Sequence, residues 1–539
     1  MVQHDADERS PTLGEHPDRL QADQTNYEYS YSKHGYTGRI MDRPADLYDR
    51  EQEWTDLSEV VESNAPGLRI AIVSGRRRQG KSYLLRRLAA HVGGMYHQAQ
   101  EVGRQQALAR FGDDVARRLG LPVGALGFED WEIALRTALR LPARGAQPAA
   151  DPDGAPRGLV LDELPYLLTH SPEIPSVLQD LYDESRQQPD YPSAAVILCG
   201  SALSVMSELL VGQNPLRGRA KLNLTVAPFD YRDAAAYWEA GDPLVAFHLA
   251  AIFGGTPGYK ALVEQEPPAS VNELGAWLAR NALNPSHALF SETDYLLRED
   301  PRVRAKETYQ SILTAVAAGN HSQTAIGGVV GRDYNHLRHP LDVLVTSGFL
   351  VKRVDVLTPS RPALYYLADP IVRFEALVTS PCRVLLEERD APEAWRQSQE
   401  TFSSRILGPH FEDIARRWTA KYAGERFGAL VGEVGSAVIN DAEGKSQHEL
   451  DVVGLRRGRR AGKAPRVVVL GEAKSSNKER TLGDLARLER IRVVLAKQDT
   501  GNASAHLVLF GRSGFDRNLT SEATGRPDVH LLDLAGLYA

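Results

Sequence analysis

The sequence is poor in cysteine and contains no long hydrophobic run. Its two cysteines, Cys199 and Cys382, are too few for a disulfide framework or a cysteine-based zinc site. No apolar stretch reaches the roughly 20 residues that a membrane-spanning helix needs. The polar, acidic residues 1–18 resemble neither a secretory signal nor a transit peptide. We therefore expect a cytoplasmic protein without membrane contact.

The chain is long, and its charge is unevenly distributed along the sequence. Its 539 residues exceed what one hydrophobic core usually serves, so several domains are expected. The net charge of −7 is unevenly distributed, because residues 1–66 hold 15 Asp and Glu against 6 Lys and Arg. The remainder is slightly basic, so nucleic acid stays a possible partner.

Apolar strands alternate with helices in the first half of the sequence. The strand at 67–75 runs into a glycine-containing turn, and an apolar-periodic helix begins near Gly80. Further buried strands are predicted at 159–163 and 194–201, and Ser171, followed by proline, predicts the start of an intervening helix. Strands separated by helices predict an α/β fold, a parallel sheet with helices on both faces as in P-loop NTPases.

A phosphate-binding pattern lies between the first strand and its helix. Gly75 and Gly80, followed by Lys81 and Ser82, match GxxxxGK[ST]. The glycines allow the backbone N–H groups to turn inward around phosphates, Lys81 adds positive charge, and the Ser82 hydroxyl can ligate Mg²⁺. ATP and Mg²⁺ are therefore the expected cofactors.

Polar residues at later strand ends extend this interpretation. Asp162 would hold Mg²⁺ through water, and Glu163 would polarise the attacking water, although a solvated strand end is the alternative. Ser201 would sense the γ-phosphate, or is simply a strand-end serine. Arg219 is a candidate finger for a neighbouring subunit's phosphate in a homo-oligomer, or a solvated surface arginine. The side chains of three loop arginines are expected to pair with acidic groups or substrate: Arg76, Arg77 and Arg78.

Several segments together resemble a known group of proteins. They are GRRRQGKS, LVLDELPYL, ILCGSALSVM, PLRGRAKLNL and FGGTPGY. The chain resembles the archaeal-type ATPases of the AAA+/STAND branch, in which an ATPase, a winged helix and a C-terminal nuclease-like domain follow in this order. The resemblance implies ATP and Mg²⁺ binding by Lys81, Ser82 and Asp162, with Ser201 at the sensor position and Arg219 in a Gly-Arg motif.

These patterns divide the chain into five parts. We expect a flexible acidic arm at 1–45, a P-loop ATPase domain at 46–265, a helical and winged-helix region at 266–382, a linker at 383–403 and a restriction-endonuclease-like domain at 404–539. The Pro/Ala/Gly-rich segment 141–158 is expected to be a surface insertion.

The winged helix is expected from three helices followed by two strands, 348–354 and 363–369. Basic and amide side chains on its last helix and wing could contact DNA. These residues are Arg332, Asn335, His336, Arg338, His339, Lys352 and Arg353. The alternative is a structural lid that packs on the ATPase core, and Pro340 would kink the helix.

The last part carries a second candidate site. Asp451 precedes Glu472-x-Lys474 by about 20 residues in an αβββαβ order, the D-x(n)-E-x-K pattern of PD-(D/E)xK nucleases. Asp451 and Glu472 would ligate Mg²⁺, and Lys474 would stabilise developing negative charge. Glu412 on the preceding helix would be an additional ligand. The alternative is an exposed salt bridge at a strand end.

Two functions remain open at this point. One is an ATP-hydrolysing protein coupled to a Mg²⁺-dependent endonuclease that acts on DNA. The other is a STAND-type signalling ATPase whose C-terminal domain only binds nucleic acid or a partner protein.

Overall fold

The computed structural model describes residues 42–63, 65–141, 157–189, 191–263, 265–300, 302–303, 306–458 and 466–539. Nearly all of the expected arm and of the expected insertion at 141–158 therefore lies outside the described residues. The described part belongs to one compact unit that begins at Ile40. None of its helices combines the length and apolarity that a membrane span requires.

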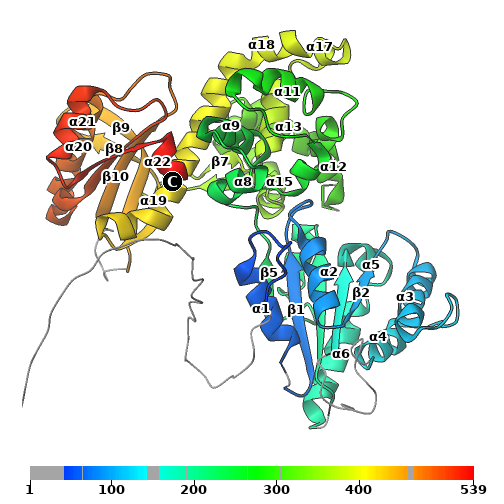
Figure 1. Cartoon of the computed structure of the whole chain (residues 1–539). Helices are drawn as coiled ribbons and strands as arrows, with labels where there is room; N and C mark the ends of the chain where they lie inside the picture. The colour runs from blue at the N-terminus through cyan, green and yellow to red at the C-terminus, as the bar shows by residue number, and fades with distance from the viewer. Residues whose placement is uncertain are drawn as a thin grey trace, which may run out of the picture. The chain divides into compact units, whose positions relative to one another are not determined.

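The first half of the described chain is built on a five-stranded parallel sheet of order β2-β3-β4-β1-β5 (Figure 1). The strands are β1 Leu68–Ser74, β2 Met95–Gln98, β3 Arg157–Asp162, β4 Ala194–Gly200 and β5 Ala220–Thr225. Every residue of the central strands β1 and β4 is buried, as expected where helices cover both faces of a sheet. The predicted parallel α/β fold is confirmed.

Helices pack on both faces of this sheet through two separate hydrophobic clusters. They are α1 Glu51–Val61, α2 Lys81–His91, α3 Arg104–Leu119, α4 Trp131–Leu139, α5 Leu164–His170 and α6 Ile174–Gln187. Helices α1 and α2 share one cluster, and α3 to α6 contribute to the other. The expected intervening helix is present as α6, but Ser171 does not cap it. Ser171 follows the last residue of α5, Glu173 precedes α6, and the Ser171 hydroxyl accepts a hydrogen bond of 2.8 Å from Trp131 Nε1.

A largely helical region follows, with a core that continues into the last part of the chain. Its helices are α8 Tyr231–Trp238, α9 Pro243–Phe253, α10 Gly258–Val263, α11 Leu274–Arg280, α12 Glu292–Glu299, α13 Lys306–Ala317, α14 Gln323–Val330, α15 Tyr334–Thr346, α16 Pro370–Phe374, α17 Arg383–Glu387 and α18 Ala391–Thr401. Helix α7 Leu203–Glu208 lies between β4 and β5 and packs on the parallel sheet. Residues 383–403, expected to be a linker, instead contain α17 and α18, which bury Leu386 and Ala394 in this core.

The last part contains a mixed sheet of order β12-β11-β10-β9-β8. Its elements are α19 Gly408–Phe427, β8 Val431–Asp441, β9 Ser446–Arg456, β10 Val467–Lys474, α20 Leu482–Gln498, β11 His506–Gly511, α21 Arg517–Thr524, β12 Val529–Asp533 and α22 Leu534–Tyr538. Strands β8, β9 and β10 are antiparallel, whereas β10, β11 and β12 are parallel. Helices α19 and α20 contribute to different hydrophobic clusters, so this sheet also separates two layers.

A short hairpin joins the helical region to the last sheet. Strands β6 Leu350–Arg353 and β7 Leu364–Leu367 are antiparallel, and the connection between them packs on β8. Val356 is buried there, and its backbone N–H donates to Ser436 O at 3.2 Å. Arg353, a candidate DNA contact on the wing, forms an ion pair of 2.5 Å with Asp413 of α19.

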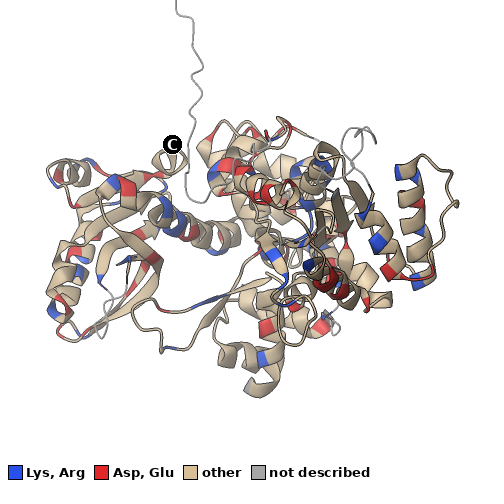
Figure 2. Ribbon diagram, turned by 90° about the horizontal axis from the view of Figure 1, so that it is seen from below, with Lys and Arg blue, Asp and Glu red and all other residues tan. Residues whose placement is uncertain are grey.

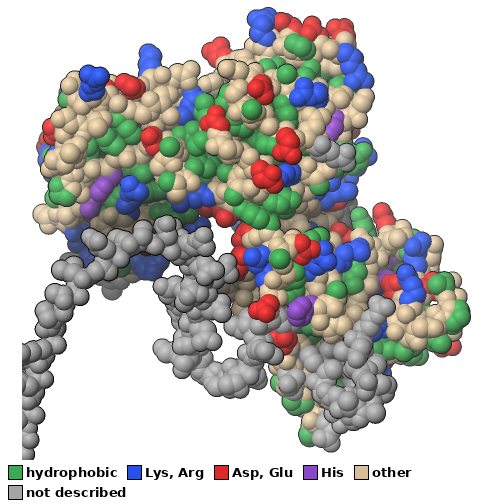
Figure 3. Space-filling view, viewed as in Figure 1, with side chains coloured by type: hydrophobic (Ala, Val, Ile, Leu, Met, Phe, Trp, Pro, Cys, Tyr) green, Lys and Arg blue, Asp and Glu red, His purple; other side chains and the backbone are tan. Residues whose placement is uncertain are grey.

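The charged residues are distributed over all three parts. Lysine and arginine lie close to aspartate and glutamate along most elements (Figure 2). On the face viewed in Figure 3, acidic and basic side chains are interspersed with hydrophobic ones. Four of the side chains predicted to face DNA on α15 are exposed: Asn335, His336, Arg338 and His339.

Candidate nucleotide site and C-terminal carboxylate site

The loop between β1 and α2 adopts a backbone that its glycines permit. Gly75 and Gly80 have φ angles of 155° and 87°, in the region that favours glycine. A Cβ on Gly75 would lie 2.6 Å from the carbonyl oxygen of Val226, so a larger residue would displace β5 or the loop. The loop thus turns at the carboxyl end of β1, where helix α2 begins with Lys81.

Lys81 extends across this loop. The side chain is buried, and its Nζ donates a 2.9 Å hydrogen bond to the carbonyl oxygen of Arg76. The ammonium group therefore lies against the loop backbone rather than in solvent. This is the position from which a lysine can contact phosphate oxygens held by the loop.

A tyrosine contacts Asp162, one of the two residues predicted to bind Mg²⁺ near the loop. Asp162 is fully buried at the end of β3 and accepts hydrogen bonds from the Tyr96 hydroxyl and, at 2.9 Å, from the Glu163 backbone N–H. Burial, and next the charge of Asp162, raise the pKa of Tyr96. The Ser82 hydroxyl has a smaller, opposite effect and lowers the pKa of Tyr96. Sequence reasoning missed Tyr96, because a tyrosine in a short strand carries no motif of its own.

Glu163 and Ser201 meet at neighbouring strand ends. The Ser201 hydroxyl donates to Glu163 Oε2 at 3.1 Å. Burial, and next the charge of Asp162, raise the pKa of Glu163, while Lys81 opposes the shift. Glu163 has a φ of 56°, an uncommon backbone conformation that costs about 1–3 kcal/mol and often marks a functional position. Ser201 therefore orients a strained, partly buried carboxylate.

Each of the three loop arginines binds a different acid in the helical region. Arg78 forms a bidentate pair with Glu292, with N–O distances of 2.7 and 2.9 Å. Arg77 pairs with Glu299 at the other end of α12.

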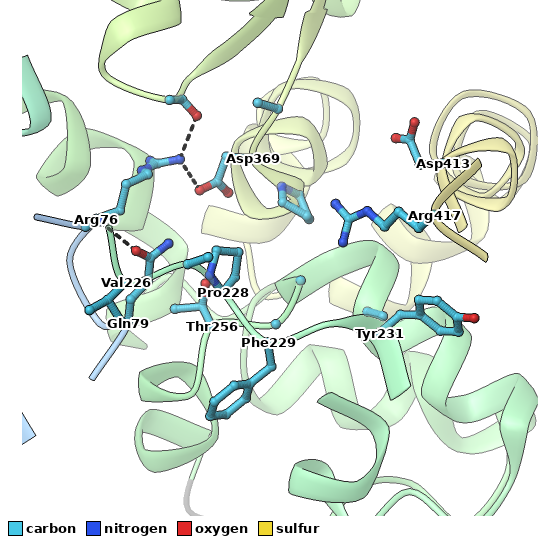
Figure 4. Close-up of a pocket in the computed structure, with 18 of the residues that line it drawn as sticks. Arg76, Gln79, Val226, Pro228, Phe229, Tyr231, Thr256, Asp369, Asp413 and Arg417 are labelled. Carbon is cyan, nitrogen blue, oxygen red and sulfur yellow. Dashed lines mark hydrogen bonds and ion pairs between the residues drawn. The ribbon is translucent and has the colours of Figure 1, made fainter. Parts of the chain in front are cut away.

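The third loop arginine reaches the residues around β6 and α16. Arg76 pairs with Asp369, the residue that caps α16, and donates to Gly348 O at 3.1 Å (Figure 4). The expectation that these arginines pair with acidic groups holds, but the acids lie more than 200 residues away and no local pattern identifies them.

Arg219 lies away from the phosphate loop of its own chain. It precedes β5, and the register of β1 with β5 places it towards the amino end of the sheet, opposite the loop. Its guanidinium forms a bidentate pair with Asp183 of α6 at 3.0 and 2.8 Å. Arg219 therefore does not contact a nucleotide held by its own chain. A contact to the nucleotide of a second copy stays a prediction.

The C-terminal candidate residues converge at the end of β10. Gly471 of β10 pairs with Val452 of β9, so Glu472 and Asp451 follow at neighbouring positions. Asp451 Oδ2 accepts from the Ala473 backbone N–H at 2.9 Å. Burial raises the pKa of Asp451, and the charge of Glu472 adds to the increase.

Lys474 and Glu412 complete the predicted set. Lys474 Nζ lies 3.5 Å from Glu472 Oε1, on the same face of β10. Burial, and next the charge of Asp451, raise the pKa of Glu412 to about 7. The carboxyl groups of Glu412 and Asp451 are therefore close enough that the ionisation of one disfavours the ionisation of the other.

Sequence reasoning missed two arginines at this site. Glu472 is buried, and Arg487 Nη1 and Arg480 Nη2 lie 2.6 and 3.2 Å from its carboxylate oxygens. Both arginines are presented by α20 and the segment before it, where single arginines on a polar stretch give no signal. Glu472 is thus neutralised by protein cations, in contrast to the exposed salt bridge of the alternative interpretation.

Both sites offer partial ligand sets for Mg²⁺. Among the described residues, no three His, Cys, Asp or Glu side chains form a group that could hold a metal ion. Mg²⁺ usually keeps several waters and is bound by one or two carboxylates together with substrate phosphates. Ser82 with Asp162 fits this pattern. Asp451 with Glu472 fits it only if Glu472 is released from its arginines.

Comparisons with known proteins give distant similarities. No family model matches the chain. A protein of Methanocaldococcus jannaschii described as uncharacterized is 25% identical over 353 residues, which cover 63% of this chain and 70% of that protein.

Three solved structures overlap with parts of the chain. A Walker-type ATPase of Pyrococcus abyssi has a TM-score of 0.45 and 20% identity, covering 63% of this chain and 98% of that one. ORC2 of Aeropyrum pernix in ADPNP–ADP complexes has a TM-score of 0.38 and 16% identity, covering 65% and 96%. A STAND protein of Pyrococcus horikoshii has a TM-score of 0.25 and 12% identity, covering 71% and 52%. These sequence identities and TM-scores are too low to carry a function over to this chain. The functional interpretation therefore depends on the residues of the chain itself.

Proposed function

We propose that this protein binds and hydrolyses ATP at the loop Gly75–Ser82 and acts as a nucleotide-controlled switch. The observation that carries the proposal is the buried ammonium of Lys81 lying across a glycine-shaped loop, beside the buried carboxylate of Asp162. Loop, cation and acid meet at the carboxyl edge of a parallel sheet, where such folds bind their ligands.

Each residue has a defined task in this proposal. The loop N–H groups and Lys81 bind the phosphates, and a magnesium ion held by Ser82 and Asp162 would neutralise charge on the β- and γ-phosphates. Glu163 accepts a hydrogen bond from the attacking water, in an orientation that Ser201 maintains. Tyr96 orients the carboxylate of Asp162 through the hydrogen bond from its hydroxyl.

The switch is carried by the three loop arginines. Phosphates that order the loop also change the positions from which Arg76, Arg77 and Arg78 reach their acids on α12 and α16. The differential contacts between loop and helical region supply the coupling free energy that such a switch requires.

ATP turnover separates the proposed roles. Lys81→Ala should lose ATP binding, because the loop loses its central cation. Glu163→Gln should bind ATP but hydrolyse it at least about a hundredfold more slowly, as expected when a general base is removed. Binding measured by titration calorimetry and phosphate release measured at saturating ATP distinguish the two variants. Wild-type turnover in the Glu163→Gln variant would contradict the assignment.

We propose a restriction-endonuclease-like fold for residues 404–539 and a winged helix within 266–382. The supporting observations are the mixed sheet β8–β12 with α19 and α20 on separate layers, and helices α13–α15 followed by the hairpin β6–β7. In this assignment residues 46–265 are the ATPase domain.

A second candidate function is metal-dependent cleavage of DNA by the C-terminal domain. Its support is that Asp451 and Glu472 occupy neighbouring positions of β9 and β10, with Lys474 Nζ 3.5 Å from Glu472, although Arg480 and Arg487 also pair with Glu472. A phosphodiester would compete with Glu472 for these arginines and free the carboxylate for a cation. The alternative is a domain that binds nucleic acid through Arg480 and Arg487 without cleaving it.

Incubation with plasmid DNA, Mg²⁺ and ATP distinguishes DNA cleavage from DNA binding without cleavage. Cleavage by the wild type but not by Asp451→Asn would support the nuclease. Binding of DNA by both proteins without cleavage would support a domain that only binds nucleic acid. Identical product patterns from both proteins would show that Asp451 does not contribute to cleavage.

A further inference from the structure

Helix α7 begins two residues after Ser201, whose hydroxyl donates a hydrogen bond to Glu163. Ala202, which lies between Ser201 and the helix, is buried. Because this connection is so short, a displacement of α7 moves Ser201 and changes its hydrogen bond with Glu163. The contacts that fix the position of α7 therefore affect the geometry proposed for ATP hydrolysis.

A buried carboxylate of the helical region holds this helix. Asp300, directly after α12, accepts a 2.6 Å hydrogen bond through Oδ1 from the hydroxyl of Ser204 in α7. Its other oxygen, Oδ2, accepts a hydrogen bond from the hydroxyl of Ser347, which follows α15. All three residues are buried, with exposed fractions of 5% or less. One carboxylate thus joins α7, α12 and α15.

Arg302 adds a second contact from the same segment of the chain. Its guanidinium pairs with Glu208, the last residue of α7, and donates to Ser204 O at 3.4 Å. Its backbone N–H donates to Asp300 Oδ1 at 3.1 Å. Together Arg302 and Asp300 hold α7 at its first turn and at its last residue.

The surroundings of Asp300 make it sensitive to the position of α7. Among the described residues, no lysine or arginine side chain forms an ion pair with Asp300, although buried charges are usually paired. The cost of burying this carboxylate is offset by three hydrogen bonds, which are roughly twice as strong as bonds between neutral groups. All three donors must therefore be in place, and this requirement restricts α7 to one position.

The same junction borders the phosphate loop. Gly348, next to Ser347, accepts a hydrogen bond of 3.1 Å from Arg76 of the loop. A Cβ on Gly348 would lie 3.2 Å from Arg76 Cδ and 3.6 Å from Leu203 Cδ1, so the loop and the first residue of α7 meet at this glycine. The phosphate loop, α7 and the helical region thus converge close to Asp300.

We propose that Asp300 is a positioning residue for ATP hydrolysis, acting through α7 on Ser201 and Glu163. Both oxygens of its carboxylate are engaged by serines, so it influences the reaction through α7 rather than by contact with ATP. A shift of α12 or α15 would carry Asp300 away from Ser204, and the helical region would thereby control the rate of hydrolysis. This inference rests on the proposed ATPase function and adds a residue outside the nucleotide site that sets the turnover rate.

The test compares ATP turnover and ATP affinity in full-length Asp300→Asn protein. The variant retains the size of the side chain but loses the charge that both serine hydroxyls bind. We expect turnover at saturating ATP to fall about tenfold or more, because small displacements of catalytic groups strongly affect the rate. ATP affinity, measured by titration calorimetry, should change by less than about twofold, because the groups assigned to ATP binding are unaltered.

Ser204→Ala removes a single hydrogen bond and decides the question if Asp300→Asn does not fold. It should also lower turnover without lowering affinity. Adding it to Asp300→Asn should cause little further loss, because both substitutions act on one contact.

Asp441→Asn is the matched control, since Asp441 is also 5% exposed but lies in β8 of the C-terminal sheet. It should leave turnover and affinity unchanged, and thermal unfolding followed by circular dichroism measures the stability of each variant. Wild-type turnover in Asp300→Asn or Ser204→Ala would overturn the inference, as would an equal loss of affinity and turnover. Absence of turnover in the wild type would overturn the proposed function itself, and this inference with it.

Discussion

The loop arginines differ in how deeply their acidic partners lie. The Glu292 side chain is inaccessible to solvent, and Arg78 is its bidentate partner. Glu299, the partner of Arg77, is 16% exposed, and Arg77 itself is 43% exposed. A buried carboxylate that loses its cation is much more costly than an exposed one, so neighbouring residues of one loop make very different contributions to stability.

Arg78→Ala should therefore lower the free energy of unfolding by about 3–5 kcal/mol, because Glu292 is left buried and unpaired. Arg77→Ala is the matched control and should cost less than Arg78→Ala, because Glu299 retains some contact with solvent whereas Glu292 has none. Urea denaturation of both full-length proteins measures the difference. Equal losses would mean that Glu292 is not buried as the structure has it.

Glu412 gives a prediction about pH. Burial and Asp451 raise its pKa to about 7 in the folded chain, against an ordinary value of 4.5. At pH values between these two, Glu412 is ionised in the unfolded chain but still protonated in the folded chain. The contribution of Glu412 to the free energy of unfolding therefore falls as the pH rises from about 4.5 to 7.

Glu412→Gln should remove this contribution. The melting temperature of the variant, relative to the wild type, should rise between pH 5 and 7 and stay level above pH 7. Glu425→Gln, an exposed change on the same helix, serves as control and should show no such trend. A pH-independent difference between wild type and Glu412→Gln would show that Glu412 ionises normally.

At the scale of single residues, sequence patterns identify groups that act through a local motif. Gly75, Gly80, Lys81 and Asp162 were predictable because the chain itself places them at strand ends. Tyr96 was not, since it meets Asp162 only after β2 and β3 pair in the sheet.

At the scale of elements, the connection between β6 and β7 fastens the last sheet to the helical region. Val356 is buried against β8, Asp355 Oδ2 accepts from the Val438 backbone N–H at 2.9 Å, and Arg361 donates to Val438 O at 3.0 Å. The two strands of the hairpin were predictable from their apolar residues. Their docking was not, because the partners are backbone atoms of another strand.

Val356→Asp should release this connection, because an unpaired carboxylate in an apolar site costs several kcal/mol. We expect faster hydrogen exchange and proteolysis at residues 354–361 and in β8. Val354→Asp, at an exposed position two residues earlier, should leave both unchanged. Unaltered protection in the Val356→Asp protein would contradict the docking.

Larger elements were predicted with similar success where periodicity decides. Three strands of the parallel sheet, β1, β3 and β4, and the order α19-β8-β9-β10-α20-β11 follow from apolar runs and helical spacing. The strands β2, β5 and β12 were not predicted. The helices α17 and α18 were missed, because their buried residues, such as Leu386 and Ala394, are few in a polar stretch.

At the scale of the whole molecule, the contacts of the loop arginines define a path from nucleotide to helical region. Two of the three acids lie on α12 and the third caps α16. Helix α16 in turn contacts α9 and the segment leading into α19, which carries Glu412. A change at the phosphate loop therefore has a continuous set of packed elements through which to reach the C-terminal carboxylates.

Hydrogen exchange with and without ATP tests this claim most directly. In the wild type, ATP should protect residues 75–82 and also change exchange in α12 (292–299) and α16 (370–374), whereas Lys81→Ala should show neither effect. Protection of the loop with unchanged exchange in both helices would contradict the account.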